Sequence, residues 1–590
     1  MIVYNGSNDG KEGVRVNVTE KTNVLERFQA WQAACEFDDL REELQSIAGN
    51  MTEIEERFYQ YVQFGTGGMR GLLGVGTNRM NVYTIRRVAY GLARYVLSFG
   101  EEAKKRGVAI AYDTRHFSYA FAVETACVLG ALGVRSFVFS ESRPTPELSF
   151  AVRYLGAAAG VVITASHNPK SYNGFKVYGE DGAQLTAAGA DAIVSYTDEI
   201  KDLFVIKSSN FEELQLDGVS TFVLDEIDTA YQDNLVYLQE RSDAEVSNDL
   251  HIVYTPLHGA GLVPVTQGLA TLGFSKVTVV AEQAVQDGAF PTVQYPNPEE
   301  MSAFELAIDI GKEKNAALLL ATDPDADRLG VAVRDGDDYT LLTGNQLGAL
   351  LLQYILQARS EKGTLALNSV MLKTIVTSEL GAAVAESFGV ATVNTLTGFK
   401  YIAEKIEQFE QTGEHSFVFG YEESYGYLIQ NFVRDKDAVQ VALVTAEMAG
   451  YYAKQGKTLL QALDDVYEQF GYYKEALVSK VFEGQAGQKQ MQEMVESFRA
   501  NIPITLAGVK VVRVEDYLSS EAKLADGSIE VLALPKENVL KFVLADDSWV
   551  AIRPSGTEPK CKIYFGVIGK SFDEATNKLL QLQQAIRDTY

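Results

Sequence analysis

The stretch "GVVITASHNPKSYNGFKVY", residues 160–178, begins as an apolar run, and a lone lysine, Lys176, follows it after one short polar loop. The run "GVVITAS" (160–166) has the composition of a buried strand and ends abruptly at Ser166 and His167. Open α/β sheets bind their ligands beyond the carboxyl ends of the strands, so a polar cluster directly after such a run marks a candidate site. Ser166 is therefore either a reactive hydroxyl or a residue that only caps a strand.

Similar apolar runs recur along the chain on both sides of this stretch. Segments between them, such as 119–133, have the apolar spacing of amphipathic helices. Alternation of short strands with helices predicts parallel α/β sheets. The runs predicted as strands are 107–113, 135–140, 160–166, 250–256, 276–281 and 316–323.

The last part of the sequence follows a different pattern. Residues 538–569 are predicted to form antiparallel strands around one loop, followed by a final helix to Tyr590. A chain of 590 residues is too long for a single core, so several domains are expected. The sequence thus predicts α/β domains closed by an α+β unit.

Charge and cysteine content exclude some classes of protein. Lys and Arg total 52 against 79 Asp and Glu, and the formal net charge of −27 repels polyanions, so nucleic acid is not expected as a partner. The three cysteines are far apart and have no metal-ligand spacing. The sequence has neither a signal peptide pattern nor an apolar run of membrane-spanning length. We therefore expect a cytoplasmic protein with no membrane partner, whose first twenty residues form a mobile extension.

A triplet of carboxylates follows the apolar run at 316–323. Asp323, Asp325 and Asp327 alternate in "ATDPDADR" (321–328), and a turning loop can direct all three at one hard cation. A calcium-binding helix-loop-helix would need Gly and Glu where this sequence has Arg328 and Arg334, so that interpretation fails. Mg²⁺ completed by water and a phosphate oxygen fits better. An acidic turn that caps a helix fits the triplet equally well.

Two further clusters carry weaker signals. "RPSGTEPK" (553–560) combines an arginine fork, hydroxyls and a glycine, which is the chemistry of a phosphate site, although a Pro-Gly-rich hairpin turn explains it too. "GYEESYG" (420–426) places Glu422, Glu423 and Ser424 after an apolar run. These side chains suit sugar hydroxyls, and they also suit the cap of a helix.

Ser166 on its own favours the capping interpretation. A serine is a poor nucleophile unless a base or a metal activates it. Neighbours on an extended chain point to opposite faces, so His167 is not expected to contact Ser166 Oγ. The glycine-flanked turn of serine hydrolases is also missing.

The order of the motifs along the chain changes this interpretation. Together they resemble the α-D-phosphohexomutase superfamily, from about residue 55 onward. The motifs are "FGTGGMRG" (64–71), "TASHNPKSYNGFKVY" (164–178), "TPLHGAG" (255–261), "ATDPDADR" (321–328), "TGFKYI" (397–402), "GYEESYG" (420–426) and "RPSGTEP" (553–559). The resemblance implies four domains around a central cleft: α/β units over 1–210, 211–331 and 332–475, and an α+β unit over 476–590.

The resemblance also implies a role for each motif. Ser166 would carry the transferable phosphoryl group and, with the three aspartates, would hold Mg²⁺. Arg70 and Arg328 would neutralise charge, while His167 and Lys176 would transfer protons, Lys176 being preferred because a cationic, partly buried site can lower its pKa. The residues expected to bind the sugar and its second phosphate are Thr397, Gly398, Lys400, Glu422, Ser424, Arg553, Ser555, Gly556 and Thr557.

The expected reaction follows from the same resemblance. The motifs "GYEESYG" and "TGFK" resemble the glucose-type mutases and their longer phosphopentomutase-like relatives more than the phosphoglucosamine mutases. We therefore expect interconversion of glucose 1-phosphate and glucose 6-phosphate through a phosphoserine enzyme, with glucose 1,6-bisphosphate as intermediate and activator. Mannose and pentose phosphates remain alternative substrates. A non-catalytic sugar-phosphate-binding relative and a metal-dependent phosphatase are the other classes considered. The family allows a monomer or a homodimer.

Overall fold

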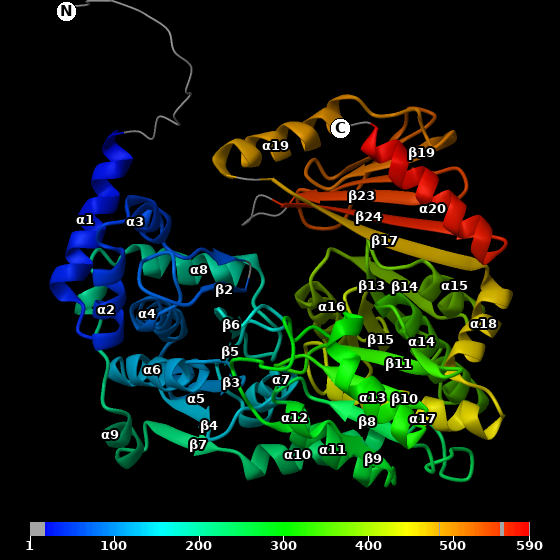
Figure 1. Ribbon diagram of the computed structural model, residues 1–590, viewed down its shortest axis with the longest axis horizontal. Coiled ribbons are helices and arrows are strands. Elements are labelled where there is room, and N and C mark those ends of the chain that lie inside the picture. The colour runs from blue at the N-terminus through cyan, green and yellow to red at the C-terminus, as the bar shows by residue number, and fades with distance from the viewer. Residues whose placement is uncertain (1–17, 66, 483, 555–559, 589–590) are drawn as a thin grey trace, which may run out of the picture.

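The computed structural model describes residues 18–65, 67–482, 484–554 and 560–588, which form four sheets with their covering helices (Figure 1). The N-terminal helices α1 (Val18–Ala34), α2 (Asp38–Ile47) and α3 (Met51–Phe58) precede the first sheet. Their apolar side chains, among them Trp31 and Phe58, pack around Tyr83. Most of the predicted mobile extension lies outside the described residues.

The first sheet contains the opening stretch of sequence. Its strand order is β1 (Phe64–Gly65), β2 (Gly68–Leu72), β6 (Tyr172–Tyr178), β5 (Ala159–Ile163), β3 (Val108–Tyr112), β4 (Ser136–Phe139) and β7 (Ser220–Val223). β5, β3, β4 and β7 are parallel, while β6 returns antiparallel to β5. The helices α4 (Val82–Ser98), α6 (Ser118–Ala131), α7 (Thr145–Leu155) and α8 (Ala187–Asp198) accompany this sheet.

The second and third sheets repeat the α/β pattern. The second has the order β12 (Asp338–Leu341), β11 (Leu329–Asp335), β10 (Leu318–Thr322), β8 (Ile252–Thr255) and β9 (Val277–Val279), with α11 (Leu262–Thr271) and α13 (Glu305–Lys314). The third has the order β14 (Ala391–Thr395), β13 (Ser369–Thr374), β15 (Ser416–Glu422) and β16 (Gly426–Leu428). Its helices include α14 (Gly344–Glu361), α15 (Leu380–Ser387), α16 (Phe399–Thr412), α17 (Ala438–Lys454) and α18 (Leu459–Phe470).

The fourth sheet is antiparallel and lies above the third in Figure 1. Its order is β17 (Tyr472–Val481), β24 (Lys560–Gly569), β23 (Trp549–Pro554), β22 (Leu540–Leu544), β19 (Val509–Asp516), β20 (Glu521–Leu524) and β21 (Ile529–Val531), with β18 (Thr505–Leu506) paired to β19. The helices α19 (Gly484–Ala500) and α20 (Phe572–Arg587) belong to this unit. The predicted α+β unit is confirmed and it ends in a helix as expected, although this helix stops at Arg587 and Tyr590 lies outside the described residues.

The sheets divide the chain slightly differently from the predicted boundaries. β7 follows residue 210 but pairs with β4 of the first sheet, and β12 follows residue 331 but pairs with β11 of the second. β17 begins before residue 476 and pairs along its length with β24. Backbone pairing between distant segments sets these limits, and local composition does not reveal it.

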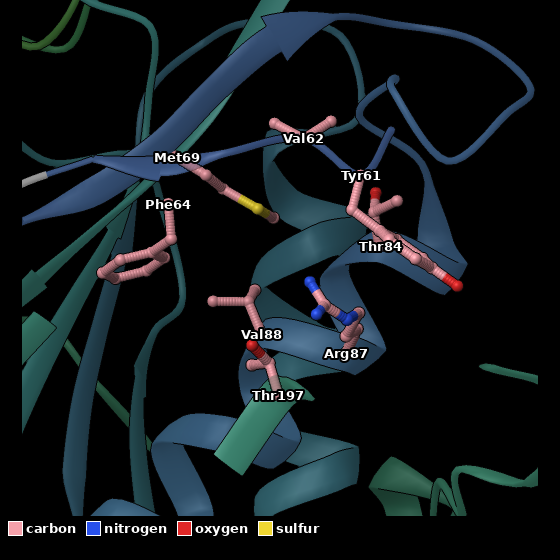
Figure 2. Close-up of a pocket in the computed structure, with 8 residues that line it drawn as sticks. All are labelled: Tyr61, Val62, Phe64, Met69, Thr84, Arg87, Val88 and Thr197. Atoms are coloured by element: carbon pink, nitrogen blue, oxygen red, sulfur yellow. The ribbon is translucent and has the colours of Figure 1, made fainter. Parts of the chain in front are cut away.

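A small pocket beside the first sheet is too narrow for a sugar phosphate (Figure 2). It lies next to Met69 on β2 and has a volume of about 10 Å³, which is about the space of one water molecule. Its lining residues are Tyr61, Val62, Phe64, Met69, Thr84, Arg87, Val88 and Thr197. The candidate site lies elsewhere, where loops of the first and second domains meet.

Candidate active site

Ser166 lies at the carboxyl end of β5 in a left-handed backbone conformation, with φ of +51°. Its backbone N–H donates to Thr164 Oγ1 over 2.9 Å, and its Oγ donates to Asp323 Oδ2 over 2.7 Å. The side chain is buried. A non-glycine residue in this conformation is strained unless its surroundings hold it, and such strain is common at functional sites. Ser166 is thus fixed against an acidic group of the second domain.

The expectation that His167 would not contact Ser166 is wrong. Ser166 Oγ and His167 Nδ1 lie 3.2 Å apart. The positive φ of Ser166 breaks the alternation of an extended chain, so the two side chains can meet. Burial, together with the charges of Arg328 and Arg70, holds the pKa of His167 well below its usual value, so the imidazole is neutral.

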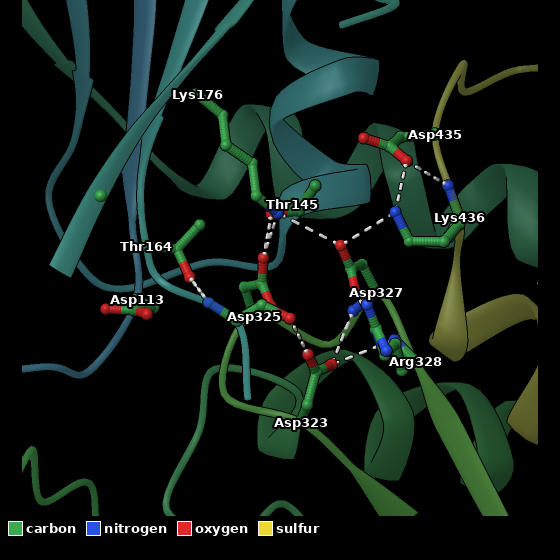
Figure 3. Close-up of polar contacts among 12 residues, drawn as sticks. Asp113, Thr145, Thr164, Lys176, Asp323, Asp325, Asp327, Arg328, Asp435 and Lys436 are labelled. Carbon is green, nitrogen blue, oxygen red and sulfur yellow. Dashed lines mark hydrogen bonds and ion pairs between the residues drawn. The ribbon is translucent and has the colours of Figure 1, made fainter. Parts of the chain in front are cut away.

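Asp323, Asp325 and Asp327 lie on the loop between β10 and β11, with one oxygen of each within 4.8 Å of the others (Figure 3). All three are buried. Asp323 Oδ1 accepts the backbone N–H groups of Asp327 and Arg328, whereas Oδ1 of Asp325 and of Asp327 has no hydrogen-bond partner among the described residues. Burial and the neighbouring carboxylates raise the pKa of Asp323 well above its usual value. Crowded carboxylates with unsatisfied oxygens fit a divalent cation.

Two lysines approach this triplet from other domains. Lys176 Nζ on β6 lies 2.8 Å from Asp325 Oδ2 and 3.2 Å from Asp327 Oδ2. Lys436 Nζ, in the loop before α17, lies 3.1 Å from the same Asp327 oxygen. Sequence reasoning missed Lys436, although the charged run "RDKD" (434–437) directly before a helix was a usable signal. The triplet therefore gathers groups from three domains.

The predicted lowering of the Lys176 pKa is wrong. Burial does lower it, but the charges of Asp325 and Asp327 raise it by more, so the net shift is upward. Lys176 is protonated in this arrangement. Lys176 is therefore a cation beside the aspartates, whereas the neutral imidazole of His167 has a ring nitrogen 3.2 Å from Ser166 Oγ.

Arg115 was also missed, and it organises the loop that follows Ser166. Its guanidinium, which is buried, donates to the backbone carbonyls of Ser166 and Asn168 and to that of Pro169 over 2.8 Å. Its Nε lies 3.2 Å from Asp113 Oδ2. The signal in the sequence was "DTR" (113–115) after the strand predicted at 107–113. Since it contacts carbonyls rather than an open site, Arg115 has a positioning role.

The two predicted arginines lie in the same region. Arg328 forms an ion pair with Glu299 and lies 3.8 Å from Asp327 Oδ1 through its Nε. Arg70 on β2 donates to Asn168 Oδ1 over 3.1 Å. Thr145 completes the contact between the domains, since its backbone N–H and its hydroxyl both donate to Asp325. Positive charge thus surrounds Ser166 and the triplet.

The residues predicted to bind sugar come together in the third domain. Glu422, at the end of β15, accepts the backbone N–H of Gly398 over 2.8 Å, which brings the segments of "GYEESYG" and "TGFK" into contact. Thr397 Oγ1 is buried without a hydrogen-bond partner among the described residues, and Ser424 is half-buried. Burial lowers the pKa of Lys400 to about 8, an effect that Glu537 opposes and Arg553 reinforces.

The phosphate motif of the fourth domain is only partly described. Arg553, at the end of β23, lies 2.9 Å from Glu537 Oε1 and acts electrostatically on Lys400, so the two segments are close. Ser555, Gly556 and Thr557 lie outside the described residues. Burial lowers the pKa of Lys436, but the charges of Asp327, Asp435 and Glu422 raise it by more, so the net shift is upward. The predicted residues that are described therefore form one continuous region.

Comparison with known proteins identifies the class that this fold and site define. Family models match residues 61–203, 229–336 and 343–470 as phosphoglucomutase/phosphomannomutase alpha/beta/alpha domains I, II and III, and residues 507–575 as the C-terminal domain. The chain belongs to the phosphoglucomutase/phosphomannomutase family. Its class is that of the phosphohexomutases, which are intramolecular phosphotransferases.

Curated relatives and solved structures support this assignment. A phosphoglucomutase of Staphylococcus saprophyticus is 37% identical over 89% of this chain and 94% of its own length, and one of Staphylococcus aureus is 39% identical over 89% and 93%. A putative phosphomannomutase structure from Thermus thermophilus has a TM-score of 0.66 at 23% identity, covering 89% of this chain and 99% of its own. Parafusin, a phosphoglucomutase from Paramecium, has a TM-score of 0.64 at 18% identity, covering 89% and 95%. These two structures share the fold.

Proposed function

We propose that the protein is an α-phosphoglucomutase, which interconverts glucose 1-phosphate and glucose 6-phosphate through a phosphoserine at residue 166 and a glucose 1,6-bisphosphate intermediate. The observation that carries the proposal is the 2.7 Å contact between Ser166 Oγ and a carboxylate of the buried aspartate triplet. The named relatives favour glucose over the other sugars. Phosphomannomutase or phosphopentomutase activity is the alternative.

The metal site is part of this proposal. Asp323, Asp325 and Asp327 would hold Mg²⁺ together with an oxygen of the phosphorylated Ser166, and the unsatisfied oxygens of Asp325 and Asp327 fit that role. When bound, the ion supplies positive charge that neutralises the transferring phosphoryl group. Arg70, Arg328 and Lys176 add fixed positive charge around the same point.

The remaining residues would position the substrate and move protons. Neutral His167, whose Nδ1 lies 3.2 Å from Ser166 Oγ, would accept or return a proton there, and the protonated Lys176 would stabilise charge. The sugar hydroxyls would be held by the third domain and the second phosphate by the fourth. The residues for these two tasks are Thr397, Gly398, Lys400, Glu422, Ser424, Arg553, Ser555, Gly556 and Thr557. Holding both ends of the substrate lets either phosphate face Ser166 after the bisphosphate turns.

Other parts of the function stay predictions. Glucose 1,6-bisphosphate is expected to activate the enzyme by phosphorylating Ser166. The partners are small sugar phosphates, and no helix among the described residues is long and apolar enough to span a membrane. A cytoplasmic location and a monomeric or homodimeric state are likewise expected.

The test is a coupled assay of glucose 1-phosphate conversion with Mg²⁺ and a trace of glucose 1,6-bisphosphate. Ser166→Ala should lower kcat by at least about 1,000-fold, because the phosphoryl acceptor is removed. Mannose 1-phosphate and ribose 1-phosphate, assayed alongside, rank the substrates. A matched control is Ser195→Ala, which removes an exposed hydroxyl of α8 in the same domain and should leave kcat unchanged.

Absence of turnover with every sugar phosphate in the wild-type protein would sink the catalytic proposal. The chain would then be a binding protein with the fold of a mutase. Release of inorganic phosphate without formation of an isomer would instead indicate a phosphatase.

A further inference from the structure

The motif "TPLHGAG" (255–261) has no role in the site described above, yet it contacts the aspartate loop directly. A Cβ on Gly259 would lie 2.5 Å from Pro324 Cα, so the two backbones touch. The N–H of Ala260 donates to Pro324 O over 2.8 Å. Leu257 and His258 both have positive φ, of +46° and +63°. Strained backbone packed against the triplet indicates a supporting function.

His258 connects this motif to a second loop, residues 285–292. Its Nδ1 lies 2.7 Å from Val285 O and its Nε2 lies 2.9 Å from Thr292 Oγ1, so the imidazole spans the two ends of the loop. Gln283 Nε2 donates to the same threonine hydroxyl over 3.0 Å. His258 is buried, so both ring nitrogens are committed to these contacts.

The loop 285–292 packs against a turn of the first domain. A Cβ on Gly288 would lie 2.4 Å from His116 N and 2.8 Å from the carbonyl carbon of Arg115. The Phe290 ring stacks on the Arg115 guanidinium, with its centroid 4.9 Å from Cζ. Phe290 itself has φ of +46° and is buried. The two domains therefore meet backbone to backbone at this point.

The contacts continue to Ser166. Arg115 donates to the carbonyls of Ser166, Asn168 and Pro169, so a shift of its guanidinium moves the loop that carries the serine. One series of packed groups thus runs from the aspartate loop through His258, Phe290 and Arg115 to Ser166. Its two ends meet again at the bond between Ser166 and Asp323.

We propose that His258, Gly288 and Phe290 are positioning residues that set the distance between the serine loop and the aspartate loop. The contacts described above for these three residues all lie within the first and second domains and do not involve the sugar-binding segments of the third. Substitution of these positioning residues should therefore lower kcat and leave KM for the sugar phosphate nearly unchanged. This inference rests on the proposed phosphoglucomutase function.

The test uses two substitutions in the full-length protein with glucose 1-phosphate, Mg²⁺ and glucose 1,6-bisphosphate. Gly288→Ala inserts a methyl group between the domains, and Phe290→Leu removes the ring beneath Arg115. Each should reduce kcat by about 10- to 100-fold, since a misplacement of about 1 Å has effects of that size. KM should change by less than about twofold. Phosphate on Ser166, measured by intact mass after exposure to the bisphosphate, should form more slowly.

Matched controls separate positioning from general destabilisation. Gly311→Ala on α13 crowds the hydroxyl of Tyr339 on β12, and Phe274→Leu opens the apolar core beside α11, both in the second domain. These variants should lose thermal stability to a similar degree and keep kcat. If Gly288→Ala does not fold, Phe290→Leu decides alone.

Two outcomes would count against the proposals, and they differ. An inactive wild-type protein overturns the proposed function. If the wild type is active and Phe290→Leu has the same kcat as the control Phe274→Leu, only the positioning role is overturned.

Discussion

Asp325 is a buried carboxylate that the described residues satisfy only in part. Its Oδ2 accepts from Thr145 and Lys176, while its Oδ1 is buried without a partner among the described residues. An unsatisfied buried carboxylate oxygen costs free energy, and a bound cation removes that cost.

Mg²⁺ should therefore raise the midpoint of thermal unfolding of the wild-type protein. A ligand that binds only the native state at 100 times its Kd adds about 2.7 kcal/mol to the free energy of unfolding. In Asp325→Asn most of this shift should disappear, because a carboxylate ligand is lost. Asp337→Asn, in the exposed turn between β11 and β12, is the control and should respond as wild type does. If millimolar Mg²⁺ does not raise the midpoint of thermal unfolding of the wild type, the result would argue against the metal site.

For single residues, the sequence predicted the members of the candidate site better than it predicted their contacts and protonation states. Ser166 and the three aspartates were singled out by their place after apolar runs, and the structure brings them together. The contact of His167 with Ser166 and the charged state of Lys176 were predicted wrongly, because each depends on one backbone angle or on partners from another domain. Lys436 reaches the site only through tertiary packing.

Among the elements, α4 is capped at its start by Asn81, which forms a capping box with Thr84. Asn81 Oδ1 accepts the N–H groups of Tyr83 and Thr84, and its Nδ2 donates to the carbonyls of Gly74 and Gly76 over 2.9 Å each. One side chain thus caps the helix and fixes the loop that follows β2, the strand of Arg70.

Asn81→Ala should lower the free energy of unfolding by about 2 kcal/mol, because a cap is lost and buried carbonyls lose their donor. Asn50→Ala, at the exposed start of α3, removes only one long bond to Glu53 N and should cost about 0.5 kcal/mol. Urea unfolding compares the two variants. Equal losses would mean that the loop contacts of Asn81 contribute nothing.

Six strands of the first two sheets were predicted from their apolar runs, whereas the limits of the sheets were not predicted. Apolar runs at 107–113, 160–166 and 316–323 became β3, β5 and β10, because buried parallel strands need continuous apolar sequence. β7 and β12 are short edge strands with exposed positions, so their composition carries little signal. Their sheets could be assigned only from backbone pairing.

At the scale of the whole molecule, the first three domains share one continuous apolar core, whereas the fourth has a core of its own. A small cluster joins the third and fourth domains, including Ile375, Tyr517 and Trp549. Beside it, Lys541 on β22 donates to Ile375 O over 2.7 Å. Burial, and then the charge of Lys373, lowers the pKa of Lys541 to about 8.

The contribution of Lys541 to the free energy of unfolding should increase as pH rises from about 8 to 10.5. In that range the folded Lys541 has lost its proton while the unfolded lysine, with its ordinary pKa of 10.5, keeps it. The unfolded state then binds more protons, so the free energy of unfolding increases with pH. Lys541→Met should remove this contribution.

The fluorescence of Trp549 reports on unfolding at the contact between the third and fourth domains. The chain has two tryptophans, so a Trp31→Phe background leaves Trp549 as the only one, and its fluorescence follows urea unfolding at the domain contact. Lys570→Met, an exposed lysine of the fourth domain, is the control. Parallel pH profiles for wild type and Lys541→Met would contradict the prediction.

The bond between Ser166 and Asp323 joins positions 157 residues apart, and this spacing has a consequence during translation. β5 and its neighbours can pair on the ribosome while the aspartate loop is still unmade. The nascent first domain then presents its serine without an acidic partner. The fourth sheet can form only later still, because β17 pairs along its whole length with β24. The contact between Ser166 and Asp323 can therefore form only after residue 323 has been made, when the strands of the first sheet are already available to pair.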